Sequence, residues 1–317
     1  MKRRRFIAAA AAAVPAITLF PADLSGISRQ TVPGKLEKRS LGRTGEMLSV
    51  IGFGGIVVMN ATHAEASERV RKAIDSGVNY FDVAPSYGDA ELKLGPALEP
   101  YRKDVFLACK TTMRTRAEAR KELEQSLQNM RTDHFDLYQH HAVTELKDVD
   151  TLLGPGGAME AFLEAREAGK IRFIGFSAHS VEAAMALMER FDFDTILFPF
   201  NYTAWHAGNF GPQVMQKARE KNMGILALKA MARGPWPEGA DRSAWPKCWY
   251  EPLHTEEDII MGLRFTLSHP VTAAIPPGDE TLFMQALGLA DRLKPLDSSE
   301  VLEIKEKALR GIPLFRA

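Results

Sequence analysis

Short apolar runs alternate along this chain with longer segments of helical pattern, and this alternation constrains the fold more than any other feature. Each apolar run is typical of a buried strand, and eight strand–helix pairs in succession predict an α/β fold, a (β/α)8 TIM barrel. We expect strands near 51–54, 79–83, 105–110, 135–140, 171–176, 195–200, 224–229 and 272–275. We expect helices near 63–76, 89–97, 115–131, 156–168, 180–190, 211–221, 255–268 and 280–292.

Two further segments flank the predicted barrel. Residues 37–50 have the pattern of a β-hairpin that would close the barrel bottom, and residues 298–310 that of an extra helix packed on the outside. The chain has 317 residues, 45% hydrophobic and 25% charged, which suits one large barrel better than two small domains. We therefore expect a signal peptide and linker at 1–36 and a single barrel domain at 37–317.

Ionisable residues stand at or just beyond the ends of three successive predicted strands. Asp82 and Tyr87 accompany the second strand, Lys110 ends the third, and His141 follows the fourth. In a parallel barrel these strand ends share one face, and catalysis takes place on that face. Each residue alone has a commoner structural explanation, such as a turn-forming aspartate or a solvated lysine. Their order at successive strand ends favours a catalytic set.

The chemistry of this set suits proton transfer to a carbonyl. A free tyrosine has a pKa near ~10, and a nearby ammonium such as Lys110 would lower it. Asp82 would keep Lys110 charged and in place, and His141 would hydrogen-bond the substrate or feed a proton to Tyr87. Tyr87 would then protonate the carbonyl oxygen as hydride reaches the carbon. Side chains alternate along a strand, so we expect His140 and His141 to face opposite sides of the sheet.

Several segments resemble the aldo-keto reductase family. Residues 77–88 are similar to its signature G-x-x-x-x-D-T-A-x-x-Y-G, and residues 136–141 to its D-L-Y-x-x-H strand. Lys110 stands where the family keeps its catalytic lysine, and residues 40–45 and 51–55 look like its N-terminal hairpin and first barrel strand. The resemblance implies a (β/α)8 barrel that reduces an aldehyde or ketone with hydride from NADPH or NADH. The family's spacing also implies that His141 faces inward and His140 faces the helix layer.

The same resemblance implies that a nicotinamide cofactor, NADP or NAD, binds at the strand ends. The cofactor-binding positions it suggests are Gly54, Gly55, Ser177, Lys229, Met231, Arg233 and Gly278. Lysine and arginine suit a pyrophosphate, although cations at strand ends are often only solvated, and glycines there are often only turns.

Three positions depart from the family's cofactor pattern. Ala178 replaces an asparagine, Pro199 stands near a usual glutamine, and Asp279, followed by Glu280, replaces a cation that holds the 2′-phosphate of NADP. Asn201 is a candidate substitute for the glutamine. A carboxylate near the 2′-phosphate would repel it, so we expect a weak preference for NADP.

The segment from Ala232 to Leu253 is long for a strand–helix connection. Long loops in compact domains are often lids or binding loops, and tryptophan with proline would make a stiff apolar wall over the barrel mouth. The alternative is that the loop packs on the barrel rim or on a neighbouring subunit. We expect a substrate-binding wall for a small carbonyl compound, either hydrophobic or sugar-like, made by Trp205, Trp236, Trp245 and Trp249.

The N-terminus has the pattern of an export signal. Basic residues at 2–5 precede an apolar run from Phe6 to Phe20 that is too short for a comfortable membrane span. The order of Arg3, Arg4, Phe6 and Ile7 resembles a twin-arginine signal, which implies the twin-arginine export machinery as a partner and a periplasmic location. The alternative is an uncleaved anchor or a basic amphipathic start, with the protein on the cytoplasmic side.

Composition excludes some classes of function. Lysine plus arginine and aspartate plus glutamate both number 40, so the net charge is zero and no basic stripe indicates a nucleic-acid partner. Cys109 and Cys248 form neither a metal-ligand pattern nor a disulfide framework, and we expect no metal site. The sequence leaves open the oligomeric state and a second function class, a non-catalytic barrel that acts as an exported binding or sensor protein.

Overall fold

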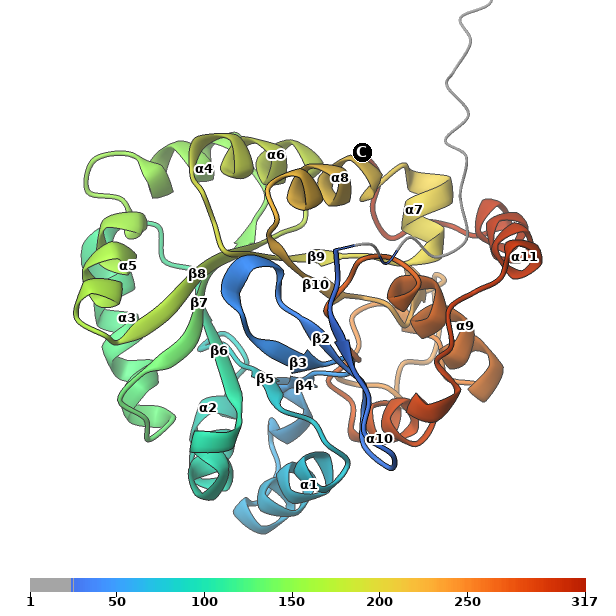
Figure 1. Cartoon of the computed structure of the whole chain (residues 1–317), viewed down its shortest axis with the longest axis horizontal. Helices are drawn as coiled ribbons and strands as arrows, with labels where there is room; N and C mark the ends of the chain where they lie inside the picture. The colour runs from blue at the N-terminus through green and yellow to red at the C-terminus, as the bar shows by residue number, and fades with distance from the viewer. Residues whose placement is uncertain (1–23, 25) are drawn as a thin grey trace, which may run out of the picture.

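Eight parallel strands form a barrel in which each strand pairs with the next along the chain (Figure 1). A computed structural model describes Leu24 and residues 26–317. A backbone bridge between Ile51 and Ala274 joins the first strand region to the last, so the sheet closes. The strands are β4 Phe53–Gly54, β5 Tyr80–Asp82, β6 Phe106–Thr111, β7 Phe135–Val143, β8 Ile171–Ala178, β9 Thr195–Pro199, β10 Gly224–Leu228 and β13 Ala273–Ile275. The predicted (β/α)8 barrel is confirmed.

Helices surround the barrel, and those expected from the sequence are present with ends within a few residues. The sequence pattern does not predict α4 and α7, because helices of 8 and 7 residues give too short a periodic signal. The α-helices are α1 His63–Asp75, α2 Ala90–Leu98, α3 Arg116–Asn129, α4 Leu146–Leu153, α5 Ala158–Glu167, α6 Val181–Arg190, α7 Tyr202–Gly208, α8 Pro212–Glu220, α9 Glu256–Leu267, α10 Glu280–Gly288 and α11 Ser298–Arg310. The 3-10 turns are η1 Gly42–Thr44, η2 Gly55–Val58, η3 Glu99–Asp104 and η4 Ala290–Arg292.

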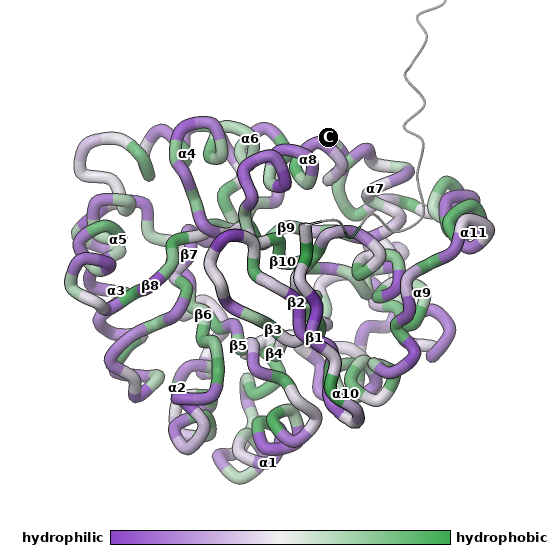
Figure 2. Tube along the Cα trace, viewed as in Figure 1, coloured by the Kyte–Doolittle hydropathy of each residue, from purple (hydrophilic) through white to green (hydrophobic). Residues whose placement is uncertain are grey.

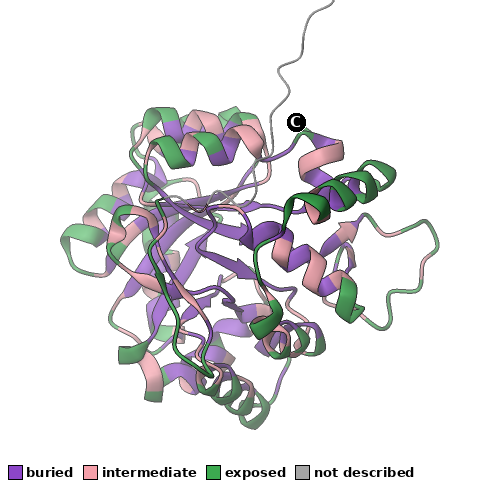
Figure 3. Ribbon diagram, turned by 45° about the vertical axis from the view of Figure 1, so that its right-hand side comes forward, coloured by how far each residue is buried: buried purple, intermediate pink, exposed green. Residues whose placement is uncertain are grey.

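Burial follows the two layers of the barrel. Hydrophilic and hydrophobic segments alternate along the outer helices, as expected for amphipathic helices that cover a core (Figure 2). The strands are buried, and the outward sides of the helices are exposed (Figure 3). One apolar cluster lies between strands and helices, and a second, smaller one fills the barrel interior.

A small antiparallel sheet closes the barrel bottom, and it lies across the centre of the ring in Figure 1. It consists of β1 Arg29–Gln30, β2 Lys38–Ser40 and β3 Met47–Ser49, so the predicted linker contributes one short strand. Leu41 and Leu48 are fully buried and join the interior cluster. Burying a leucine side chain stabilises a fold by about 1.5–3 kcal/mol, so these two residues hold the sheet against the barrel.

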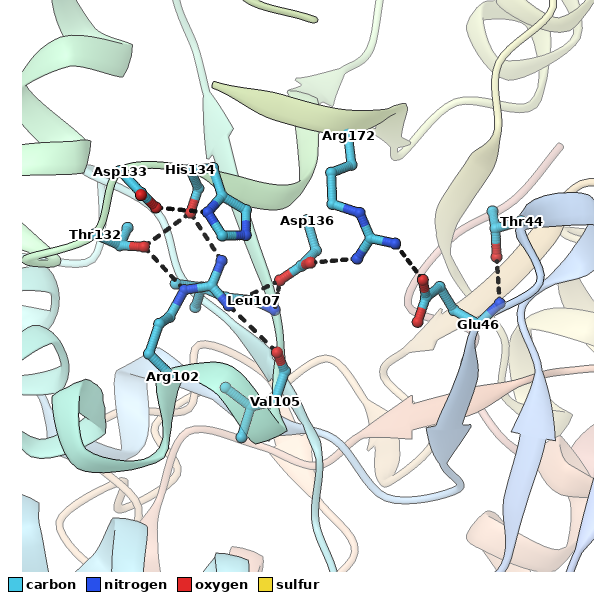
Figure 4. Close-up of polar contacts among 10 residues, drawn as sticks. All are labelled: Thr44, Glu46, Arg102, Val105, Leu107, Thr132, Asp133, His134, Asp136 and Arg172. Atoms are coloured by element: carbon cyan, nitrogen blue, oxygen red, sulfur yellow. Dashed lines mark hydrogen bonds and ion pairs between the residues drawn. The ribbon is translucent and has the colours of Figure 1, made fainter. Parts of the chain in front are cut away.

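A charged network ties this bottom sheet to the strands (Figure 4). The buried Asp136 carboxylate accepts hydrogen bonds from Arg172 at 2.6 Å and from the Leu107 backbone N–H at 2.9 Å, and it lies 3.1 Å from Arg102. Arg172 also pairs with Glu46, next to β3. Because every ion in this network has an opposite charge beside it, the network is a structural joint at the amino ends of β6, β7 and β8.

Most of the predicted signal peptide, residues 1–23, lies outside the described residues. Among the residues that the structure does describe, no helix is long and apolar enough to cross a membrane.

Candidate active site

The four residues predicted at the strand ends meet at the carboxyl end of the barrel. Lys110 on β6 donates a hydrogen bond to Asp82 at the end of β5, and a second one, of 3.2 Å, to the Val83 carbonyl oxygen. The Lys110 nitrogen lies 5.0 Å from the centre of the Tyr87 ring. The His141 ring stands edge-on to Tyr87, with 5.7 Å between ring centres. Three neighbouring strand ends thus hold one cluster.

Strand alternation explains why these side chains meet. On β6 the side chains of Ala108 and Lys110 share the face that lines the barrel interior, and on β7 Leu137 and His141 do the same. His140 has the opposite orientation, because its ring stacks on Phe162 of α5 with 4.1 Å between centres. The predicted orientation of His140 toward the helices is therefore confirmed.

Two neighbours of Asp82 were not identified from the sequence. The Gln139 side-chain amide donates to Asp82 at 3.1 Å, and the Tyr80 hydroxyl donates to the same carboxylate oxygen at 3.2 Å. Both residues are fully buried. Gln139 precedes His141 by two positions on one strand, and side chains two positions apart share a face. This spacing could have placed Gln139 on the inner face with His141. With Lys110, these donors hold the Asp82 carboxylate in one orientation.

Burial and charge set the protonation of the cluster. Burial acts to lower the pKa of Lys110, but the negative charge of Asp82 and its hydrogen bond to the ammonium act to raise it, so the pKa is raised and the ammonium stays charged. Burial raises the pKa of Tyr87, and the Lys110 charge opposes this only in part. Lys110 thus acts to lower the Tyr87 pKa as expected, but the net pKa is raised, because desolvation of the phenolate is the larger effect.

His141 is neutral at physiological pH. Burial lowers the pKa of His141 to about 2, and the positive charge of Lys110 contributes in the same direction. Its Nδ1 lies 3.4 Å from the Ser86 hydroxyl, and its backbone oxygen accepts a 3.0 Å hydrogen bond from Arg114. A neutral imidazole beside Tyr87 can donate or accept a hydrogen bond at a carbonyl oxygen without carrying charge.

A second cation, Lys229, stands beyond the end of β10. Its nitrogen lies 5.3 Å from the centre of the Trp249 ring and 5.1 Å from that of Tyr250. Its backbone is left-handed, with φ +63°. Burial lowers the pKa of Lys229 to about 8. In the described part of the chain no carboxylate lies within ion-pair distance of this ammonium, which leaves it available to an anion.

The group of residues at the barrel mouth fits a nicotinamide dinucleotide. Lys229 offers a charge for a pyrophosphate, and Ser177, whose oxygen accepts a 2.8 Å hydrogen bond from the Ala142 N–H, keeps its own hydroxyl hydrogen to donate. The side-chain nitrogen of Asn201 is buried and has no acceptor among the described residues, while its oxygen caps α7. The Ser177 hydroxyl and the Asn201 amide nitrogen are donors of the kind that would bind the carboxamide oxygen of a nicotinamide.

Other predicted cofactor-binding positions have structural neighbours of their own. Arg233 donates to Asp258 at 2.6 Å and lies 3.3 Å from Glu251, so its charge is already paired, and Met231 is fully buried. A Cβ on any of three glycines would crowd a side chain: at Gly54 it would lie 3.0 Å from Ile275, at Gly55 2.7 Å from Val83, and at Gly278 2.3 Å from Ile56. Packing therefore accounts for glycine at Gly55 and Gly278 with or without a ligand, and the contact at Gly54 is only tight.

The two carboxylates after β13 also have partners. Asp279 caps α10 by accepting the backbone N–H groups of Thr281 at 2.9 Å and Leu282 at 3.2 Å. Glu280 pairs with Arg69. Arg69 therefore places a positive charge beside Glu280, one of the two carboxylates that are expected to disfavour NADP.

The four tryptophans do not form one wall. Trp205 on α7 packs against Phe265 and His269 in the helix layer, with 6.1 and 4.5 Å between ring centres, so its expected place at the mouth is wrong. Its partners come from α9 and the residues after it, which the local sequence does not reveal.

The other three tryptophans lie in the long loop. This loop contains β11 Ala232–Gly234 paired with β12 Glu251–Pro252. Trp236 donates to the Cys248 carbonyl oxygen at 2.9 Å, and Trp245 packs against His254. Trp249 is 57% exposed and lies beside Lys229. Trp236 and Trp245 thus shape the loop, and Trp249 is the one beside a residue of the mouth.

Comparisons with known proteins agree with this geometry. The family model described as "Aldo/keto reductase family" matches residues 50–247. Aldo-keto reductase YhdN of Bacillus subtilis is 30% identical over 218 residues, which is 63% of this chain and 63% of that protein. L-galactose dehydrogenase of Arabidopsis thaliana is 26% identical over 216 residues, which is 63% of this chain and 67% of that protein. The aligned region thus spans about two thirds of the length of these relatives.

A solved structure shows the same fold. The holo form of an aldo-keto reductase from Bacillus halodurans superposes with a TM-score of 0.68 at 22% sequence identity, covering 87% of this chain and 97% of that chain. At this identity the likeness concerns the barrel architecture.

Proposed function

The chain belongs to the aldo/keto reductase family, and from this premise we propose that it reduces the carbonyl group of a small aldehyde or ketone with NADPH or NADH. The observation that carries the proposal is the contact of Lys110 with Asp82 and its position 5.0 Å from the Tyr87 ring, with His141 alongside. A bound nicotinamide supplies the hydride. The chain's own residues bind the carbonyl and deliver the proton.

Tyr87 is the proposed general acid. Its raised pKa keeps the hydroxyl protonated at neutral pH, so a proton is available at the start of the reaction. As negative charge develops on the carbonyl oxygen, the Lys110 ammonium favours the phenolate that Tyr87 becomes. The neutral His141 donates a hydrogen bond that orients the carbonyl oxygen toward Tyr87.

Asp82 is a positioning residue in this proposal. Its contacts with Lys110, Gln139 and Tyr80 fix the lysine and keep it charged. Lys229, Ser177 and Asn201 would hold the cofactor, and Trp249 would bound the substrate. Two matched relatives are named for sugars, L-galactose dehydrogenase and 6-dehydroglucose reductase, which makes sugar-like carbonyls the first substrates to test.

A comparison of two tyrosine variants tests the proposal. Oxidation of NADPH and NADH is followed with a panel of sugar-like and hydrophobic aldehydes and ketones, using the wild-type protein, Tyr87→Phe and Tyr101→Phe. Loss of a general acid lowers turnover about 10²–10⁴-fold, and this loss is expected for Tyr87→Phe with an unchanged circular dichroism spectrum. Tyr101 lies on η3, and its variant serves as the matched control. Full turnover by Tyr87→Phe would overturn the assignment.

The non-catalytic alternative receives no support from the comparisons, since the matched relatives carry reductase and dehydrogenase names.

We further propose that residues 1–36 direct export through the twin-arginine pathway to the periplasm. The support is the sequence alone: Arg3 and Arg4 before the apolar run from Phe6 to Phe20. Fractionation of cells that express the full chain, with Arg3→Lys plus Arg4→Lys as the comparison, tests this. Periplasmic wild-type protein and a retained variant are expected, and equal distribution of the two would contradict export.

A further inference from the structure

A cavity of about 860 Å³ lies outside the barrel, between α8 and the end of α9. Met215 of α8 forms one wall, Phe265 and His269 form the opposite wall, and Ile225 of β10 lies at the floor. Trp205, which was expected at the barrel mouth, lines this cavity instead. We call it the α8–α9 cavity. It shares no lining residue with the ionisable cluster at the mouth.

The walls of the α8–α9 cavity are largely apolar, and polar side chains in them have partners within the fold. The Nδ1 of His269 donates a 2.8 Å hydrogen bond to a backbone carbonyl oxygen of α9. Ser268 accepts a 2.8 Å hydrogen bond from the Leu296 N–H, and the Thr272 hydroxyl donates to the Ser40 carbonyl oxygen at 2.9 Å. An occupant is therefore expected to bury apolar surface here rather than to supply missing hydrogen bonds.

The described part of the chain begins at this same cavity. Gly26 and Ile27 line it, and they follow Leu24 at the start of the described residues. A turn holds them there, because the Ile27 N–H donates to the Leu24 carbonyl oxygen at 3.2 Å and Gly26 has a φ of +84°. The N-terminal segment, residues 1–23, is thus tethered at the edge of the α8–α9 cavity.

The N-terminal segment has the apolar side chains and the reach to fill the cavity. Its apolar run from Phe6 to Phe20 ends six residues before Gly26. At about 3.3 Å per extended residue, Phe20 can lie up to about 20 Å from Gly26. The cavity follows α8, a helix of 9 residues, over about 13 Å. Leu19 and Phe20 can therefore reach its full length.

We propose that residues 18–22 dock in the α8–α9 cavity of the full chain, with Leu19 and Phe20 against its apolar walls. A segment tethered at the edge has an effective concentration of about millimolar, so it is favoured over a second copy or a free ligand at lower concentration. Only the folded barrel offers this cavity, so docking links the covering of the apolar run's end to folding. The barrel mouth stays open, and the proposal depends neither on the reductase activity nor on export.

Disulfide formation within the full chain tests the proposal. Phe20→Cys is combined with Gln216→Cys, because Gln216 lines the cavity and is exposed. The native Cys109 and Cys248 are buried, so they should not compete for oxidised glutathione. The mass of the purified chain is verified before oxidation, because the N-terminal segment must be present.

Phe20→Cys combined with Asp192→Cys is the matched control. The Asp192 side chain is 70% exposed and pairs with Arg43, which follows Gly42 of the cavity. Asp192 thus lies near the cavity without forming part of its wall. The Phe20→Cys and Gln216→Cys pair should form a disulfide at least about tenfold faster than the control, and unfolding in urea should remove the difference. Equal rates in the folded protein would overturn the proposal.

A third variant tests the chemical basis of docking. Leu19→Asp, added to the Phe20→Cys and Gln216→Cys pair, places a charge on the apolar segment and should lower the rate to that of the control. An unchanged rate would show that the segment does not dock through its apolar side chains, and would overturn the proposal. A disulfide between two chains, seen as a dimer on a non-reducing gel, would place a second copy in the cavity and would overturn it too.

Discussion

Two buried aspartates at opposite ends of the barrel show what distinguishes a structural joint from a reactive group. Asp136, at the bottom, contacts two arginines and a backbone N–H, and one of those arginines continues to Glu46. Asp82, at the mouth, contacts one lysine together with two neutral donors, Gln139 and Tyr80. Both carboxylates are almost fully buried, so burial alone does not separate them.

The difference lies in what surrounds each pair. Around Asp136 the positive and negative charges compensate one another, and this network of ion pairs links the bottom sheet to three strands. Around Asp82 the lysine faces a tyrosine, and the neighbouring Lys229 has no carboxylate within ion-pair distance in the described residues. At the mouth, Tyr87 beside Lys110 can give up its proton. At the bottom, the ion pairs around Asp136 leave no proton to transfer. The two ends should therefore respond differently to mutation.

The largest expected effect is on turnover at the mouth. Lys110→Met removes the charge that stabilises the Tyr87 phenolate, and turnover per folded molecule should fall about 10²–10⁴-fold. The folded fraction is measured in parallel, because Asp82 is left buried without its partner. Lys170→Met is the matched control, since Lys170 forms a partly exposed pair with Glu124 and should keep its rate. A Lys110→Met enzyme with normal turnover would remove the distinction between the two ends.

The next effect is on stability at the bottom. Asp136→Ala leaves Arg102 and Arg172 without their shared carboxylate and should lower the free energy of unfolding by roughly 3–5 kcal/mol, measured by urea denaturation. Turnover per folded molecule should stay near that of the wild type. A loss of turnover without a loss of stability would place Asp136 in the reactive group and contradict the comparison.

A smaller effect is expected on cofactor affinity. Lys229→Met should weaken cofactor binding about tenfold while it changes turnover at saturation less. The free protein has a Lys229 pKa of about 8. Its ammonium is present below that pH, so wild-type affinity should decline as the pH rises through about 8, and this decline should be absent in Lys229→Met. Equal pH dependence in the two proteins would show that Lys229 does not touch the anion.

The smallest effect concerns His141 and pH. Because the pKa of His141 is lowered to about 2, the ring stays neutral over the ordinary titration range of histidine, near pH ~6.5. The profile of kcat/KM should therefore lack a His141 inflection between about pH 5 and 7. His141→Gln should lower the rate without changing the shape of the profile. An inflection that disappears in His141→Gln would show a charged histidine in the cycle.

The sequence predicts this barrel well because its signals are local and repeated. Each strand is a short apolar run, and the alternation of side chains places Asp82, Lys110 and His141 on the inner face. The bottom joint was not predicted, since Arg102, Asp136 and Arg172 are distant in the chain and no local pattern pairs them. Trp205 was misplaced for the same reason: its partner His269 lies on a distant segment. The raised pKa of Tyr87 was not predicted, because it depends on how deeply the phenol is buried, and a sequence pattern does not give that depth.

Titration of the purified protein with NADPH and with NADH, followed by tryptophan fluorescence, tests the central claim that the mouth is a reductase site. Trp249 lies beside Lys229, so a cofactor bound there should quench fluorescence in a saturable way below about millimolar concentration. Asp279, together with Glu280 and its partner Arg69, predicts at most a weak preference for NADPH over NADH. Saturable quenching by either nucleotide would support the account. The absence of quenching by both, at millimolar concentration, would contradict it.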